Sequence, residues 1–588
     1  MARFASILVL SLVSFTIAHF INFKFAFAIT LLSITIILVF LILKNFELRV
    51  DKSEFVFLSV FLFFIFLRFL DPSIFDAEKF MDMAFMNSIL KSPSLPPNDP
   101  FFASARLDCY YYFGHVFGAT IILLSFSPSE IGYNVAVSAI PAYTALLIFG
   151  IFREEKKIAF LAIFLTMFSG NAYSFLDFLL NPFSIGYLYY WNSTRVIDGT
   201  INEFPYFSFI HADLHAHVFA IPIKVFLITL LSEKRSLPMI PLTLFAIFIM
   251  NPWDFPLVFL FTLLFSFFQR NIWIFIYSLF SLPFVFLYFS TMNLPKTEII
   301  FSNERTDALQ FLGYSATLLL LISASLDKRK FIYSIGPSIL FYFFSPLLPI
   351  LIPFAISTLL SRGEDQSKSL ILTGIISFVL PEFLVVDSRM NTVFKFYLVA
   401  WIFISIGAMM KFKTENMDKR RKFLIAILLV LTLVYPVVAT PLRYHTKNFT
   451  LDGMDFTRNF GEYKALQWLK ERKGVIIEEG CTRDPLCGYS YGGRVAVFTG
   501  NPTVIAWTNH EFQWRRNYEI IAERARDVRK FYSATNCEEM IELVEKYKIN
   551  YIFLGYEERK IFSIREELFE KCFRKVFEDG NVKIFQKN

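Results

Sequence analysis

The chain contains 588 residues, of which 55% are hydrophobic and 75 are phenylalanine, and its formal net charge is +7. Such a composition is too apolar for an ordinary soluble protein and predicts a polytopic membrane protein. The basic residues are scattered through short loops and form no stripe that follows a phosphate backbone, which argues against a nucleic-acid partner.

Apolar runs follow one another up to residue 441, and roughly 20 such residues suffice for a membrane helix. No small-residue cleavage pattern of a signal peptide follows the first run, so we expect this run to be retained. From residue 442 the composition is that of a soluble domain. We therefore expect a soluble domain at 442–588 and a membrane region at 1–441 of about fifteen helices, at 3–21, 25–43, 54–70, 131–152, 156–175, 214–231, 236–250, 254–269, 271–289, 311–326, 331–345, 346–361, 368–385, 392–411 and 422–441.

Basic residues fall in every second loop between these helices, which places the loops in the cytoplasm by the positive-inside rule. The N-terminus is then cytoplasmic, and the C-terminal domain and two long loops, 71–110 and 176–213, are outside. This orientation requires that 110–126 does not cross the membrane, so we expect its tyrosines to anchor it along the outer interface. The basic clusters are Lys44/Arg49/Lys52, Arg153/Lys156/Lys157, Lys234/Arg235, Arg270, Lys328/Arg329/Lys330, Arg362/Lys368 and 411–422.

The first outer loop carries three carboxylates directly after a membrane helix: Asp76, Glu78 and Asp82. Beside a low-dielectric wall a carboxyl group has a raised pKa and can exchange protons near neutrality, so these three are the candidate catalytic residues. Glu78 and Asp82 are four residues apart and share a face if the segment is helical, with Lys79 beside them. A solvated acidic loop without chemistry is the alternative.

The second outer loop ends in an alternating polar pattern, His211, Asp213, His215 and His217. An extended segment places all four on one side, whereas a helix pairs His211 with His215 and Asp213 with His217. Either arrangement suits a divalent metal ion, which is the only cofactor the sequence suggests. The alternative is a polar helix cap that bonds to its own backbone.

Further polar residues fall on the same outer face, and ionisable groups at membrane depth usually face a cavity or a partner. Arg389 and Lys395 lie at the outer end of one helix and suit an anion such as the phosphate or pyrophosphate of a lipid carrier. A salt bridge to Asp387 or to an acidic residue of the first loop is the alternative. The other candidate binding residues are Lys79, Arg106, Asp108, Tyr110, Tyr111, Tyr112 and Asp254.

Five segments, taken in this order, resemble the YYY membrane protein family of archaea and some bacteria. They are Glu78–Asp82 (EKFMD), Asp108–Gly114 (DCYYYFG), Glu203–Phe209 (EFPYFSF) followed by Asp213–His217 (DLHAH), Asn251–Pro256 (NPWDFP) and Arg389–Tyr397 (RMNTVFKFY). Gly492–Thr503 and His510–Arg515 in the tail are also similar to that family. The family's layout is similar to that of the C-type glycosyltransferase superfamily (GT-C), with two additional N-terminal helices.

The resemblance implies a membrane glycosyltransferase that moves a sugar from a polyprenyl-phosphate carrier to an extracytoplasmic glycan, lipid or protein acceptor. Glu78 or Asp82 would then activate the acceptor with help from Asp76, and Arg106, Arg389 and Lys395 would bind the carrier phosphate. A membrane transporter or lipid flippase with an outward-facing polar site is the alternative, and a structural protein whose tail binds a partner is the third.

The tail alternates helical and strand patterns, which predicts a small α/β domain. We expect helices at 462–472, 518–532 and 538–546, strands at 475–478, 494–498 and 551–555, and a hairpin around Asp579 and Gly580. Cys481 and Cys487 are close enough for a disulfide in an outer compartment. The tail shows no nucleophile, phosphate loop or zinc spacing, so acceptor binding or a structural cap is its expected role.

Overall fold

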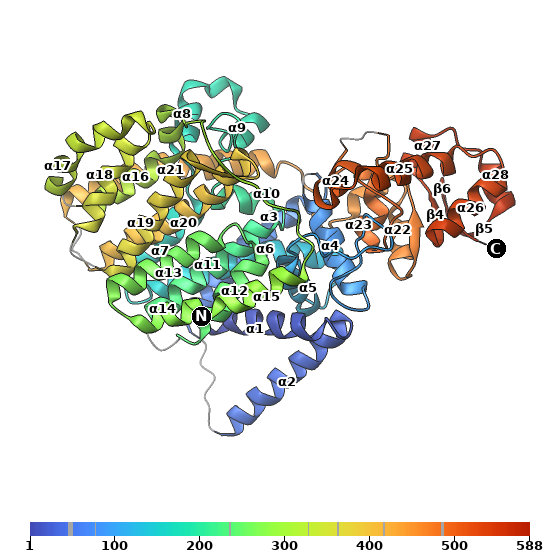
Figure 1. Ribbon diagram of the computed structural model, residues 1–588, viewed down its shortest axis with the longest axis horizontal. Coiled ribbons are helices and arrows are strands. Elements are labelled where there is room, and N and C mark those ends of the chain that lie inside the picture. The colour runs from blue at the N-terminus through green and yellow to red at the C-terminus, as the bar shows by residue number, and fades with distance from the viewer. Residues whose placement is uncertain are drawn as a thin grey trace.

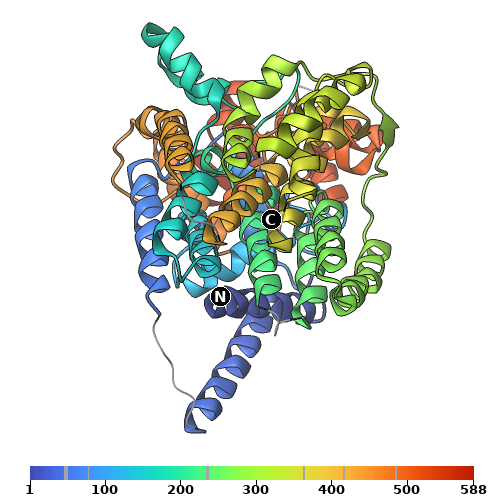
Figure 2. The same ribbon diagram turned by 90° about the vertical axis from the view of Figure 1, so that its left-hand side faces the viewer.

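The computed structural model describes residues 1–44, 51–76, 78–233, 237–326, 328–361, 364–414, 418–483 and 487–587. A large helical bundle forms most of the molecule, and a smaller unit of helices and strands lies beside one end of it (Figure 1). Figure 2 shows α2 (Phe23–Leu43) extending away from the body of the bundle. Arg49, Lys234, Arg235 and Arg362, which belong to the basic clusters of the sequence, lie outside the described residues.

The bundle is built around α6 (Ser129–Ile151) and α20 (Arg389–Thr414), two helices that are almost wholly buried, whereas α2 and α3 (Ser53–Leu70) lie at its periphery. A small antiparallel pair of strands, β1 (Ile299–Phe301) and β2 (Leu384–Val386), connects two of its loops. The helices of the bundle, besides α2, are α1 (Ala2–Ile17), α3 (Ser53–Leu70), α4 (Lys79–Lys91), α5 (Phe113–Leu124), α6 (Ser129–Ile151), α7 (Lys156–Ile163), α8 (Ala172–Leu180), α9 (Tyr187–Asn192), α10 (Pro205–His211), α11 (Ala216–Ser232), α12 (Met239–Met250), α13 (Phe255–Gln269), α14 (Ile272–Leu279), α15 (Ser281–Thr291), α16 (Ala308–Ser325), α17 (Lys328–Ser338), α18 (Leu348–Leu359), α19 (Asp365–Val379), α20 (Arg389–Thr414) and α21 (Lys419–Arg443).

Seven of the described helices are long and apolar enough to cross a membrane, or eight if the bent pair Lys156–Phe168 and Ala172–Leu180 is one span. The sequence predicted about fifteen, more than helix length and composition support in the described part of the chain. Several expected spans are shorter helices, among them α1, α11, α12, α13 and α18. The run at 331–345 changes after Pro337 from α17 into the 3-10 helix Ile339–Phe343. Apolar composition favours burial away from water but does not set the length of a helix. Helix length also depends on proline residues, which interrupt a helix, and on hydrogen-bond partners for the backbone.

The C-terminal unit contains a four-stranded sheet in the order β3-β4-β6-β5. β3 pairs in parallel with β4, and β6 pairs antiparallel with both β4 and β5. The strands are β3 (Val475–Ile477), β4 (Ile549–Leu554), β5 (Arg574–Asp579) and β6 (Val582–Gln586), and the helices are α22 (Tyr463–Lys470), α23 (Arg494–Thr499), α24 (Thr508–Arg515), α25 (Tyr518–Tyr532), α26 (Cys537–Tyr547), α27 (Tyr556–Ile561) and α28 (Glu566–Cys572).

The strand expected at 494–498 is wrong, because these residues form the buried helix α23. The sequence Arg-Val-Ala-Val-Phe suggests a strand. However, every residue of α23 is buried, so this segment has no alternation of buried and exposed side chains that would favour a strand. The Glu478 carboxylate accepts hydrogen bonds from the backbone N–H groups of Val495 and Ala496 at 2.8 and 2.9 Å. These bonds satisfy donors at the helix start that have no partner within the helix.

Helix α4 joins the two parts of the molecule. It packs against α5 and α6 of the bundle on one side and against α23 of the C-terminal unit on the other. The Asn87 amide donates to the Val497 carbonyl at 2.9 Å, and the Lys91 ammonium donates to the Thr499 carbonyl at 2.8 Å. In the loop after α4, the Ala103 N–H donates to the Thr503 carbonyl, and the Thr503 N–H donates to the Pro100 carbonyl. The first outer loop of the sequence is therefore largely an interior element.

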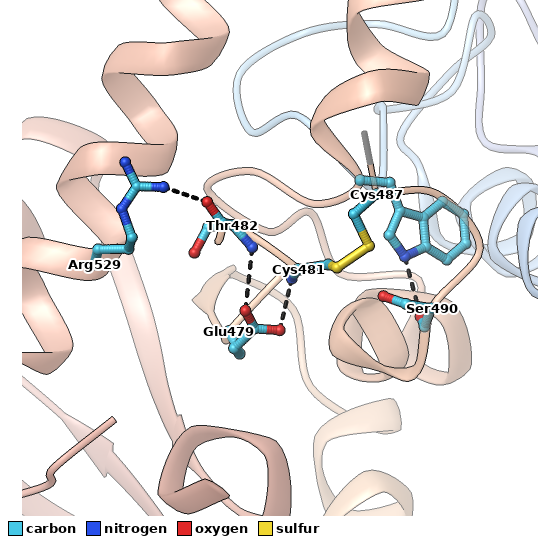
Figure 3. Close-up of a disulfide and its surroundings, with 7 residues drawn as sticks. Glu479, Cys481, Thr482, Cys487, Ser490 and Arg529 are labelled. Carbon is cyan, nitrogen blue, oxygen red and sulfur yellow. Dashed lines mark hydrogen bonds between the residues drawn. A yellow bond between two sulfur atoms is a disulfide. The ribbon is translucent and has the colours of Figure 1, made fainter. Parts of the chain in front are cut away.

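Two disulfides stabilise the C-terminal unit. The expected bond between Cys481 and Cys487 is present, with the two Cα atoms 6.1 Å apart (Figure 3). The Glu479 carboxylate accepts bonds from the N–H groups of Cys481 and Thr482 and so fixes the turn at the start of this loop. A second disulfide, Cys537 to Cys572, connects α26 to α28 across 35 residues and was not predicted. Cys109 is free and buried.

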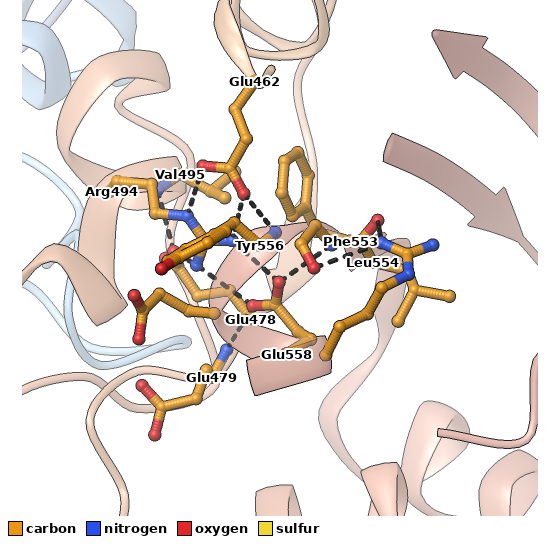
Figure 4. Close-up of polar contacts among 12 residues, drawn as sticks. Glu462, Glu478, Glu479, Arg494, Val495, Phe553, Leu554, Tyr556 and Glu558 are labelled. Atoms are coloured by element: carbon orange, nitrogen blue, oxygen red, sulfur yellow. Dashed lines mark hydrogen bonds and ion pairs between the residues drawn. The ribbon is translucent and has the colours of Figure 1, made fainter. Parts of the chain in front are cut away.

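A buried guanidinium organises the C-terminal unit (Figure 4). Arg494 donates to Glu462 at 2.7 Å and to Glu558 at 2.7 Å, and it lies 3.8 Å from Glu478, with all four side chains removed from water. These carboxylates come from the starts of α22 and α27 and the end of β3. Burial raises the pKa of Glu478 to about 8 although Arg494 opposes this shift. Burial would also raise the pKa of Glu462, but pairing with Arg494 holds it below the usual range.

We expect four of the five cysteines to be inaccessible to a thiol reagent in unfolded, unreduced protein. Peptide mapping under non-reducing conditions should recover Cys481 joined to Cys487 and Cys537 joined to Cys572. Only Cys109 should be alkylated. Alkylation of any of the other four before reduction would contradict this pairing.

Replacing Arg494 should destabilise the C-terminal unit strongly. Arg494→Leu leaves the Glu462 and Glu558 carboxylates buried without their cation, which typically costs about 3–5 kcal/mol of unfolding free energy. Hydrogen exchange in β4 and α27 should report the loss. Arg526→Leu, at an exposed position, is the control and should change little. Equal exchange rates in the two variants would show that the network does not stabilise the unit.

Candidate functional site

The start of α4 is where residues from four separate parts of the chain meet. Glu78 precedes α4, His215 precedes α11, Lys395 lies in the second turn of α20, and Tyr489 comes from the C-terminal unit. The sequence predicts a site role for the first three of these residues but not for Tyr489. Because the first and the last of these residues are 411 positions apart and the other two are well separated between them, only the folded chain brings the four together.

Glu78 is a carboxylate that is desolvated and yet reachable. The Tyr489 hydroxyl donates to its Oε1 atom at 3.2 Å, and Nδ1 of His215 lies 3.2 Å from its Oε2 atom. Its side chain keeps 31% of its surface accessible. Burial raises the pKa of Glu78 to about 7, although the positive charge of Lys395 opposes the shift. At neutral pH this group can therefore take up a proton from a bound molecule and release it again.

A chain of polar contacts leads from Glu78 into the bundle. The Tyr110 hydroxyl lies 3.0 Å from Nε2 of His215, and the Nδ1 atoms of His215 and His217 lie 2.8 Å apart. The Lys395 ammonium is 3.5 Å from each of these two Nδ1 atoms. Two facing imidazole nitrogens make a hydrogen bond only when one of them carries a proton. The arrangement thus places a cation and a transferable proton next to Glu78.

Asp82 has a different environment from Glu78, one turn away. Its Oδ1 atom lies 2.9 Å from Nε2 of His115, and its Oδ2 atom accepts a hydrogen bond from the backbone N–H of Leu214 at 2.8 Å. The side chains of Asp82 and His115 are both 0% exposed. No substrate atom can reach Asp82 in this state, so we assign it a positioning role, holding the turn before α11 against α4.

Two more carboxylates lie deeper in the same polar region. Glu203 lies in one of the family segments but was not predicted as a site residue. Its carboxylate accepts a hydrogen bond from the Ser208 hydroxyl at 2.8 Å and lies 3.3 Å from Nε2 of His217. Asp213 is buried, and its Oδ1 atom has no hydrogen-bond partner in the described part of the chain. Burial raises the pKa of both groups. The position of Glu203, ten residues before Asp213, was the available signal for including it.

The alternating residues His211, Asp213, His215 and His217 do not lie together on one face of a single strand or helix, the two arrangements that the sequence suggested. Ala212 adopts a left-handed conformation with φ 64°, and α11 begins at Ala216, so the segment is neither one strand nor one helix. His211 instead bonds to the Tyr190 hydroxyl at 2.8 Å. Within the ranges that the structure describes, no group of three or more His, Cys, Asp or Glu residues is arranged to hold a metal ion.

The sequence predicted that the three tyrosines anchor a segment along the outer interface next to the acidic loop, but in the structure they pack within and against the protein core. Tyr110 and Tyr112 are buried inside the protein, and Tyr111 stacks on Tyr110 with ring centroids 4.4 Å apart. The hydroxyl of Tyr112 has no partner among the described residues. The reason is that α4 and the C-terminal unit cover this segment, so the rings pack against protein instead of lipid headgroups. Tyr110 also contacts Trp514 of the C-terminal unit, with centroids 5.2 Å apart.

Four other candidate binding residues have structural partners elsewhere. Arg106 donates to the carbonyls of Ser94 and Pro96, and Asp108 accepts from the Asn293 amide at 2.6 Å. Arg389 contacts Thr306 and Glu382, six residues before Lys395 in the same helix, so the two cations do not form one anion site. Asp254 forms a buried ion pair with Lys224.

Asp76 and Lys79 face a different space from Glu78. They line a cavity of about 410 Å³ together with Asp71, His211 and Arg443. The cavity lies between the end of α3, the start of α9, the end of α21 and the 3-10 helix Asp455–Phe460 of the C-terminal segment. The expected catalytic trio is therefore divided: Asp76 in this cavity, Glu78 at the histidine and lysine cluster, and Asp82 in the closed interior.

A family described as uncharacterized membrane protein (DUF2298) matches residues 8–404. This range contains all five membrane segments that carried the resemblance in the sequence, which confirms the expected membrane protein family. No curated protein matches the chain. Among solved structures the chain is similar to the archaeal oligosaccharyltransferase AglB from Archaeoglobus fulgidus, in complex with an inhibitory peptide and a dolichol-phosphate. The identity is 10% and the TM-score 0.41, over 91% of this chain and 74% of that chain. A likeness this distant establishes neither fold nor activity.

Asp82 and His115 should behave as one unit. Asp82→Asn and His115→Gln should each lower the stability of the folded protein by about 1–3 kcal/mol, because each leaves a buried polar partner poorly satisfied. The double variant should lose less than the sum, with a coupling of about 0.5–3 kcal/mol. Thermal unfolding of the purified full chain measures all four proteins. Additive losses would mean that the contact does not stabilise the site.

Proposed function

Because the chain belongs to the DUF2298 family of membrane proteins, we propose that it is a membrane glycosyltransferase. It moves a sugar from a polyprenyl-phosphate carrier to an acceptor at the outer membrane face. The observation that carries this proposal is Glu78, a reachable carboxylate whose pKa burial raises to about 7, beside the buried cation Lys395. Inverting transfer needs this pair of charges, a base for the acceptor and a positive group for the departing phosphate.

In the proposed reaction Glu78 takes the proton from an acceptor hydroxyl. The acceptor oxygen forms a bond to the anomeric carbon of the sugar while the bond from that carbon to the carrier phosphate oxygen breaks, and the electron pair leaves with the phosphate. Lys395 stabilises the negative charge that develops on the leaving oxygen. The products are the glycosylated acceptor and the free carrier phosphate, and Glu78 is left protonated.

His215 and Tyr110 are suited to position Glu78 and to return its proton to solvent. His215 lies between the Glu78 carboxylate and the Tyr110 hydroxyl, with contacts of 3.2 and 3.0 Å. The stacked rings of Tyr110 and Tyr111 supply a flat aromatic wall next to Glu78. The C–H groups of a sugar ring carry partial positive charge and pack favourably on such a face.

The two disulfides support an extracytoplasmic position of the C-terminal unit, because such bonds persist in oxidising compartments. In this topology the N-terminus is cytoplasmic, and the site at Glu78 opens on the side where lipid-linked sugars are consumed. The partners are then membrane lipid, a polyprenyl-phosphate-linked sugar and an extracytoplasmic glycan, lipid or protein acceptor.

The proposal predicts that Glu78→Gln abolishes sugar transfer. The assay uses purified membranes, a panel of labelled polyprenyl-phosphate sugars and the native acceptor fraction. Loss of a general base should reduce the rate about 10²–10⁴-fold. Glu154→Gln, at a carboxylate that is 74% exposed, is the matched control and should keep full activity. Wild-type transfer by Glu78→Gln, or no transfer from any donor by the native protein, would refute the assignment.

The pH profile gives a second readout of the same group. Only deprotonated Glu78 can accept a proton, so the rate should rise with pH through about 7 and then level off. A chelator added in parallel tests whether the transfer reaction also needs a divalent metal ion, in addition to Lys395, to neutralise the charge of the leaving phosphate. A rate that is flat between pH 6 and 8 would contradict the role of Glu78.

A further inference from the structure

The cavity of about 410 Å³ next to the start of α4 has the size of a small-molecule site. Glu78 does not line it, so it is a second space beside the proposed reaction centre. Residues of both parts of the molecule form its wall: Asp71 and Lys79 from the segment around α4, Arg443 from the end of α21, and Phe456 and Phe460 from the C-terminal segment.

Lys79 is the main sign that the cavity receives a ligand. It is 1% exposed and lines the cavity, and the carboxylates whose negative charges act on its ammonium group are those of Asp213 and Asp76. Thr446, another lining residue, has a buried hydroxyl that lacks a hydrogen-bond partner in the described part of the chain. A buried polar group without a partner costs free energy, so it is retained where a ligand completes its bonds.

The charges around the cavity balance each other. Arg443 donates to Asp71 at 2.7 Å, and the remaining charged side chains, Asp76 and Lys79, have opposite signs. His211 adds no charge, because burial lowers its pKa well below the usual value. A phosphate dianion would therefore meet as many carboxylates as cations. A neutral ligand with many hydroxyl groups can use both the donors and the acceptors.

The apolar part of the wall is aromatic: Phe75, Tyr187, Phe456 and Phe460. Phe75 and Tyr187 are 44% and 55% exposed, so the protein leaves much of their ring surface uncovered. Phe456 packs against Phe75 with centroids 5.2 Å apart and holds it in place. Free ring faces beside paired donors and acceptors suit a ligand that has a flat C–H face and a rim of hydroxyl groups.

We propose that this cavity binds a saccharide. Lys79 donates hydrogen bonds to its oxygens, Asp71 and Asp76 accept from its hydroxyl groups, and Phe75 and Tyr187 pack against its C–H face. The proposal goes beyond the proposed function, because it concerns a separate space and holds whatever reaction occurs at Glu78.

The test measures sugar binding directly. Saturation-transfer NMR is recorded on the purified full chain in a detergent without a sugar headgroup. The probes are methyl glycosides of glucose, mannose, galactose, N-acetylglucosamine and N-acetylgalactosamine. We expect signal transfer to the ring protons of at least one glycoside. Lys79→Met and Tyr187→Leu should each weaken that binding at least tenfold, because each removes a direct contact.

Folding and binding are read separately. Lys79→Met removes a buried charge whose desolvation costs free energy, so its melting temperature should equal or exceed that of the native protein. Tyr333→Leu changes another exposed tyrosine away from the cavity and should bind like the native protein. Glu78→Gln should also keep sugar binding, so failure of the transfer reaction and failure of this proposal are distinguishable. The proposal is overturned if no glycoside binds, if Lys79→Met and Tyr187→Leu bind normally, or if inorganic phosphate binds in place of the sugars.

Discussion

The burial of α4 between the bundle and the C-terminal unit is the constraint on which the rest of the site depends. Its residues from Lys79 to Ile89 are all buried, although the helix carries Lys79 and Asp82. Such a helix is stable only if each polar group finds a partner or a ligand. Asn87 and Lys91 find carbonyls of α23, and Asp82 finds His115 and Leu214. These contacts fix α4 against the bundle and the C-terminal unit. They therefore also fix the positions of Glu78 and Lys79 at the start of the helix.

Environment, not residue type, separates the roles of the carboxylates. Glu78 and Asp82 are four residues apart, and burial raises the pKa of both. Glu78 keeps accessible surface, while Asp82 is closed off by His115. A proton can therefore leave or reach Glu78, whereas Asp82 can only hold structure. The same distinction applies in the C-terminal unit, where Arg494 neutralises carboxylates that no ligand reaches.

Much of the candidate site could be predicted from the motifs, because they contain residues that lie close together in the folded protein. Glu78, Tyr110, His215 and Lys395 were all selected from the sequence, and the structure joins them by contacts of 3.0 to 3.5 Å. Arg389 was selected for the same reason as Lys395, yet its partners are Thr306 and Glu382. Six residues are not a whole number of turns in a helix with about 3.6 residues per turn, so the two side chains point in different directions. Proximity in sequence therefore did not imply a shared ligand. Tyr489 was missed because no spacing pattern connects it to the other residues, whereas Glu203, ten residues before Asp213, lay in a quoted motif and was not selected.

The sequence by itself determined the membrane class, the helical character of the first 440 or so residues, the mixed helix and strand content of the tail and the family motifs. These follow from composition and local periodicity, which depend on residues close together in the chain. The tertiary structure decided the number of helices long enough to cross a membrane, the helical form of α23, the bond between Cys537 and Cys572, and the separation of Asp76, Glu78 and Asp82 into three environments. The physical reason is that desolvation and pairing depend on neighbours hundreds of residues away, which no local pattern specifies.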